Sequence, residues 1–72
     1  MNWHPHGMQL HAEGPHGRTF RLDMTSRPYS LWMDRPGLTP LWVGNYQVAI
    51  TAQEEAEHLA EGLARINNRT GD

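Results

Sequence analysis

The chain contains no cysteine and no lysine, and each absence narrows what the protein can be. Without cysteine it can form neither a disulfide framework nor a thiolate zinc site. The lack of thiols fits a reducing compartment, and we predict a cytoplasmic location. All six basic side chains are arginines, scattered along the chain and outnumbered by eight acidic ones. Such scattering is not typical of a phosphate-binding surface.

Long apolar runs are also missing. No stretch approaches the roughly 18–20 apolar residues of a membrane helix, and the first residues do not show the basic-then-apolar order of a secretory signal. We therefore expect no membrane partner. With 72 residues, the chain is expected to form a single domain, residues 1–72, with a thin core and marginal stability.

Alternation of apolar and polar residues is the main pattern in the first two thirds of the chain and predicts antiparallel strands. Residues 1–7 lack this pattern and are expected to form a loose N-terminal arm. The sheet is expected within residues 8–50. Its predicted strands cover residues 8–13, 18–24, 29–34 and 41–50, the last bent, bulged or divided at Gly44-Asn45.

The last third of the chain predicts one helix over residues 51–67. Thr51 and Glu54 have the spacing of a capping box at its start. One apolar stripe follows, rich in alanine, so that the helix can lie close to the sheet. It comprises Ala52, Ala56, Leu59, Ala60, Leu63 and Ile66. Gly62 beside it costs about 1 kcal/mol in helix propensity, which indicates either a close backbone approach or low order.

Asn67-Asn68 is expected to end the helix, and residues 68–72 are expected to fray. The predicted fold class is therefore α+β: an antiparallel sheet of three to four strands with one C-terminal helix packed on one face, in the order ββββα.

Two tryptophans are the leading candidates for a binding site. If their apolar neighbours face the helix, Trp32 and Trp42 point to the uncovered face of the sheet. The turn between them would place the two rings opposite one another across a strand pair. Arg21 and Arg27 could flank this patch, and tryptophan is enriched among interface hot spots. The alternative is that one tryptophan closes the end of the core and the other lies flat on the surface.

Four of the five histidines lie near the N-terminus, at positions 4, 6, 11 and 16. Converging imidazoles could bind zinc, copper or nickel. Their spacing matches no closed metal motif, so ordinary surface histidines are the favoured interpretation. We predict no cofactor and no metal site, and the function of these histidines stays open.

Catalytic motifs are absent from the sequence. It contains no Gly-x-Ser-x-Gly, no His-Glu-x-x-His and no glycine-rich phosphate loop. Glu57 and His58 are adjacent, but neighbouring helical residues point about 100° apart. We therefore predict that the protein is not an enzyme.

One nucleic-acid-binding class resembles part of the chain. A three-stranded sheet followed by a helix that opens with Thr51-x-x-Glu54-Glu55-Ala56 resembles the amino-terminal arm-binding domains of tyrosine integrases and the AP2 type, over roughly Tyr29 to Arg65. The resemblance implies DNA binding through the sheet. The sequence departs from these domains because it lacks the basic strand residues that grip DNA.

The remaining hypothesis is a small, non-enzymatic protein-binding regulator or inhibitor. The chain resembles, in size and style, small proteins carried by bacteriophages and mobile elements, among them anti-CRISPR inhibitors of host defence. The predicted partner is another protein, bound through the open sheet face or an edge strand. Homodimerisation through the same surface is compatible with this hypothesis, since a dimer would cover both tryptophans.

Overall fold

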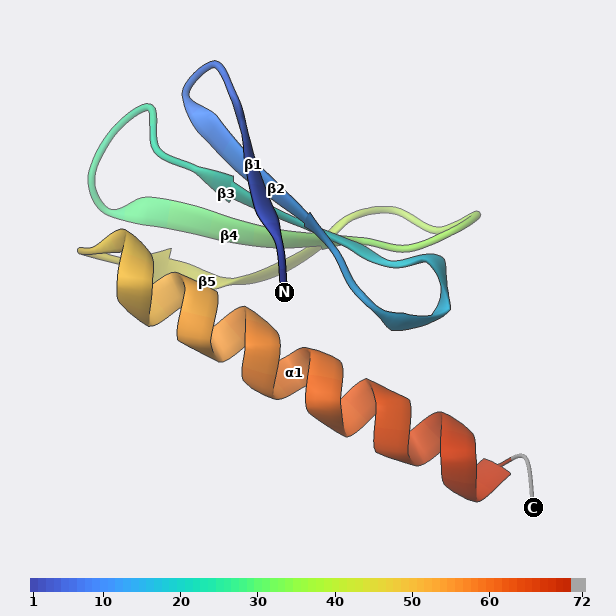
Figure 1. Ribbon diagram of the computed structural model, residues 1–72. Coiled ribbons are helices and arrows are strands. Elements are labelled where there is room, and N and C mark those ends of the chain that lie inside the picture. The colour runs from blue at the N-terminus through green and yellow to red at the C-terminus, as the bar shows by residue number, and fades with distance from the viewer. Residues whose placement is uncertain (71–72) are drawn as a thin grey trace.

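A computed structural model describes residues 1–70, with side chains described as far as Arg65. It consists of a five-stranded antiparallel sheet and one long C-terminal helix that crosses one face of the sheet (Figure 1). The strands are β1 (Trp3–His6), β2 (Gln9–Glu13), β3 (Thr19–Asp23), β4 (Tyr29–Asp34) and β5 (Leu41–Tyr46). A short 3₁₀ turn, η1 (Pro15–Gly17), joins β2 to β3, and the helix is α1 (Ala49–Thr70).

The strands pair in sequence order, β1-β2-β3-β4-β5, so every connection within the sheet is a hairpin. The predicted α+β class is confirmed, although the sheet has five strands instead of three to four. The additional strand is β1, in the segment that was expected to be a loose arm. The expectation that residues 1–7 lack alternation is wrong, because Trp3 and Pro5 alternate with two histidines there. Strand β1 pairs with β2 in a register that sets Trp3 opposite Ala12. Trp3 packs against the core, which holds this strand in place.

The core lies between the sheet and α1. Phe20, Leu22 and Leu31 are completely buried, and each contributes about 1.5–3 kcal/mol by leaving water. The helix meets them with Ala52 and Ala56, which are also fully buried. Because alanine side chains are short, the helix backbone lies close to the sheet, as the alanine-rich stripe predicted. No polar or charged residue in the described part of the chain is buried.

The helix is longer than predicted at both ends. It begins at Ala49, so Thr51 lies inside the first turn and does not cap it. Starting earlier lets Ala49 pack against the core. At the other end the helix continues through the two asparagines to Thr70, because asparagine is a weak helix former but not a helix breaker. Of the predicted frayed tail, residues 71–72 lie outside the described residues.

Strand β5 is shorter than expected and ends at Tyr46. Its register with β4 shifts between Leu31, which lies opposite Gly44, and Trp32, which lies opposite Trp42. Val43 is thus the extra residue of a β-bulge, close to the expected irregularity at Gly44-Asn45.

Gly62 has open space around it. A Cβ at this position would meet no atom within 4 Å apart from the helix's own backbone, so the interpretation as a close backbone approach is wrong. Within residues 1–70, no helix combines the length and the hydropathy needed to cross a membrane.

Candidate functional site: the open face of the sheet

The face of the sheet opposite α1 carries one row of side chains across all five strands. Residues that alternate with the buried core residues must point to this open face. The strand registers place five of them side by side, one per strand. This row, called the tryptophan row below, consists of His4, His11, Arg21, Trp32 and Trp42. The expected juxtaposition of Trp32 and Trp42 is therefore present, and Arg21 lies directly beside Trp32.

Arg21 is fixed by two neighbours on β4. Its Nε donates to Asp34 Oδ2 at 2.8 Å and its Nη2 donates to Asp34 Oδ1 at 3.1 Å, a bidentate pair. The guanidinium carbon also lies 5.8 Å from the centroid of the Trp32 ring, within the range of a cation–π contact. Hydrogen bonding to Asp34 raises the pKa of Arg21 above its usual value. The arginine is therefore held in one orientation at the centre of the row.

Trp42 is the most solvent-exposed apolar part of the row, with 52 % of its surface accessible. Its indole Nε1 donates to Asn45 Oδ1 at 3.4 Å, and Ser30 Oγ donates to the same oxygen at 3.2 Å. These contacts orient the ring but leave its face open. Trp32 is only half-buried, so both tryptophans present apolar surface to the solvent.

Arg27 does not join this patch. It lies in the loop between β3 and β4, where its Nε donates to the Tyr29 hydroxyl at 3.3 Å. Its guanidinium sits 5.4 Å from the Tyr29 ring centroid. Tyr29 belongs to the set that packs against the core, so Arg27 is drawn away from the tryptophans. The predicted flank of two arginines is reduced to Arg21.

The open face carries more negative than positive charge. Glu13, Asp23 and Asp34 share it with the single arginine, Arg21, among the described residues. Asp23 accepts hydrogen bonds from the Thr25 hydroxyl and amide at 2.6 and 3.0 Å. These bonds lower the pKa of Asp23, so it stays ionised. Sequence reasoning missed Asp34 as a site residue because only the β3–β4 register brings it beside Arg21.

Three histidines gather at the β1–β2 end of the same face. His4, His6 and His11 line a hollow of about 280 Å³ together with Glu13 and Thr19. The His6 and His11 rings stack with centroids 4.4 Å apart, and His11 Nε2 bonds to Gln9 Oε1 at 2.8 Å. Burial, followed by the nearby His6 and Arg21, lowers the pKa of His11. The lowered pKa favours the neutral form of His11. Within the described residues no group of three ligands is arranged to hold a metal ion.

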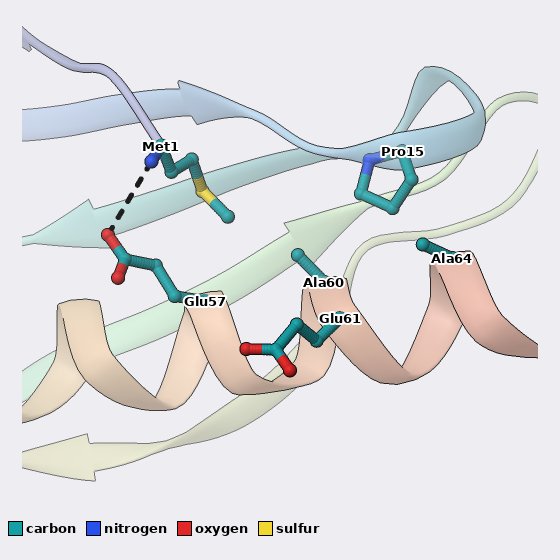
Figure 2. Close-up of a pocket in the computed structure, with 6 residues that line it drawn as sticks. All are labelled: Met1, Pro15, Glu57, Ala60, Glu61 and Ala64. Atoms are coloured by element: carbon teal, nitrogen blue, oxygen red, sulfur yellow. Dashed lines mark ion pairs between the residues drawn. The ribbon is translucent and has the colours of Figure 1, made fainter.

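A second hollow lies on the helix side of the molecule, between the N-terminus, η1 and α1 (Figure 2). It measures about 400 Å³ and is lined by Met1, Pro15, Glu57, Ala60, Glu61 and Ala64. The Met1 amino group lies 3.8 Å from Glu57 Oε2. Glu61 is 66 % exposed and already pairs with Arg65 at 2.7 Å. Small alanines and solvated carboxylates give this hollow little to hold a ligand, so the open face is the better candidate site.

Comparison with protein-family models, with curated proteins and with solved structures gave no match to this chain. A function for this chain therefore has to be inferred from the geometry of the open face.

Proposed function

We propose that the protein is a small, non-enzymatic regulator or inhibitor that binds a partner protein through the open face of its sheet. The observation that carries the proposal is the tryptophan row, in which Trp42, 52 % exposed, adjoins Trp32 and an immobilised Arg21. Tryptophan and arginine are enriched among the residues that dominate binding energy at protein interfaces. A row fixed by hydrogen bonds loses little side-chain entropy when a partner docks.

The charges of the face indicate what kind of surface the partner presents. Because three carboxylates accompany one arginine, the face attracts basic side chains around an apolar centre. We therefore propose a partner with an apolar side chain that packs on Trp42, surrounded by lysine or arginine. That description fits a protein surface better than nucleic acid, because carboxylates repel phosphates and Arg21 is already paired with Asp34.

The origin of the chain in a phage or mobile element stays a prediction from size and style. A host-defence protein with a basic surface is one partner class that it suggests. The binding experiment described next tests both this partner class and the nucleic-acid alternative.

The test begins with immobilised protein, exposed to lysate of the encoding organism with and without nuclease. Trp42→Ala is the probing variant, and Met8→Ala is its matched control, since Met8 is 58 % exposed in the turn between β1 and β2. We expect one stoichiometric protein that survives nuclease and binds wild type and Met8→Ala alike. Trp42→Ala should weaken binding at least about 30-fold, the effect of a hot-spot residue.

The purified partner is then titrated at low and high salt. A modest decrease in affinity with salt supports a face whose centre is apolar. Recovery of nucleic acid, with a steep salt dependence, would contradict the proposal and favour the integrase-type resemblance. Equal binding by wild type and Trp42→Ala would also contradict it, because the tryptophan row would then lie outside the interface.

A further inference from the structure

The two edge strands of the sheet differ in how they are protected against pairing with another strand. Strand β1 has four residues, and one of them, Pro5, has no N–H to donate to a neighbouring strand. Strand β5 has six residues and contains no proline. No described segment pairs with its outer side, so its outward backbone N–H and C=O groups are available to another strand.

Strand β5 also lies in a segment without charge. From Pro36 to Gln53 there is no arginine, aspartate, glutamate or histidine, and all the charged residues lie elsewhere in the chain. Proteins commonly protect an exposed edge with charged side chains, prolines or bulges. Strand β5 has the bulge at Val43 but no charged side chain and no proline. Five of the seven large hydrophobic residues that are exposed in the described part of the chain fall in this segment. They are Leu38, Leu41, Trp42, Val48 and Ile50.

We infer that the outer edge of β5 pairs with β5 of a second copy of this chain, which gives a dimer with a continuous sheet. Two-fold symmetry at a shared edge sets a segment against itself. Any charge in that segment would therefore lie near the same charge of the other copy. The segment from Pro36 to Gln53 has no such charge, so self-pairing meets no electrostatic repulsion, which favours a second copy over a charged partner.

The symmetry also fixes the arrangement of the dimer. A two-fold axis perpendicular to the sheet makes the two β5 strands antiparallel. Both open faces then lie on the same side of the joined sheet, and both helices lie on the other. The two tryptophan rows then share one surface, and the Trp42 end of each row lies on the strand at the joined edge. This dimer uses the strand edge and leaves the open face available for a partner.

The size of the contact predicts a dimer that dissociates on dilution. Stable interfaces bury about 800 Å² per partner, and a six-residue strand supplies only part of that area. Apolar residues at both ends of β5 extend the contact. Leu38 is 61 % exposed in the loop before the strand, and Val48 and Ile50 are 47 % and 62 % exposed after it.

Sedimentation velocity tests the inference. The protein concentration is varied from about 1 μM to about 1 mM, which spans the dissociation constants typical of weak dimers. We expect twice the mass of one chain at the high end and a monomer at the low end. Leu41→Lys places a charge on the edge and should keep the protein monomeric throughout the range. Met8→Lys, an equivalent exposed change near β1, should leave the dimer intact. Circular dichroism establishes that each variant is folded, and Val48→Lys replaces Leu41→Lys if that variant does not fold.

Amide hydrogen exchange at both ends of the concentration range locates the contact. Protection should increase with concentration at amides of Leu41–Tyr46 and stay constant in Trp3–His6. A monomer at every concentration overturns the inference. A dimer that persists in Leu41→Lys also overturns it. If Trp32→Ala abolishes such a dimer, the two copies are joined through their open faces instead.

Discussion

The two faces of the sheet are built from alternating residues of the same strands, yet they follow different rules. On β4, Leu31 is completely buried against the helix, while the next residue, Trp32, is half-buried on the open face beside Arg21. The core face contributes hydrophobic side chains to one buried cluster, which also contains Ala52 and Ala56 of α1. The open face mixes tryptophan, histidine and paired charges. One face is specified by the need to exclude water, and the other is not constrained by burial against the helix.

The largest expected effect comes from breaking the core face. Leu31→Ala should lower the free energy of unfolding by about 2–5 kcal/mol, through lost burial and the cavity left behind. In a chain of this size that is a large part of the total stability. Trp32→Ala, one residue away, should cost much less stability, since its side chain is only half-buried. Urea denaturation of both variants measures the difference, and equal losses would contradict the division between the faces.

A smaller loss of stability is expected from a substitution at Gly14, where the turn before β3 meets the core. A Cβ at Gly14 would lie 2.8 Å from Phe20 Cε2, and Phe20 is completely buried, so its ring cannot move away freely. Gly14→Ala should therefore destabilise the protein by about 1–3 kcal/mol, the usual effect of overpacking a core. Thermal unfolding measures it, with Gly62→Ala as the control because it places the same methyl group in open space.

Gly62→Ala should itself stabilise the protein. Since an added Cβ contacts nothing outside the helix, the change keeps only the gain in helix propensity, about 0.8–1.0 kcal/mol. The melting temperature should increase accordingly. A decrease in the melting temperature would contradict the prediction, because it would mean that the added methyl group meets another part of the protein.

The smallest effect concerns pH and the histidines of the open face. The pKa of His11 is lowered from its ordinary value of 6.5, first by burial and then by His6 and Arg21. Because the folded state binds this proton less readily than the unfolded state, the contribution of His11 to stability is complete above pH 6.5. It is lost as the pH falls through the folded pKa. His11→Gln should therefore reduce the loss of stability between pH 7 and pH 5, as measured by denaturation at each pH. His58→Gln, an exposed change on α1, should leave that loss unchanged.

The sequence by itself determined the alternation of the three central strands, the alanine stripe of the helix and the assignment of both tryptophans to the face away from the helix. These features depend on local periodicity, which a strand or helix imposes on its own residues. The segment Trp3–His6 shows the same alternation over only four residues, too few to separate a strand from an arm before its partner is known.

Only the tertiary structure decided which side chains meet across strands. Arg21 and Asp34 are thirteen residues apart in the sequence, and Arg27 is nearer than Arg21 to Trp32 along the chain but turns to Tyr29. A shift of one residue in the β3–β4 register would have placed Arg21 beside a core residue instead. The extra residue at Val43 and the position of the uncharged strand β5 at the sheet edge likewise depend on which strand lies beside which. The register between strands depends on contacts between residues far apart in the sequence and on the burial of a whole face against one helix. Local periodicity therefore cannot predict it.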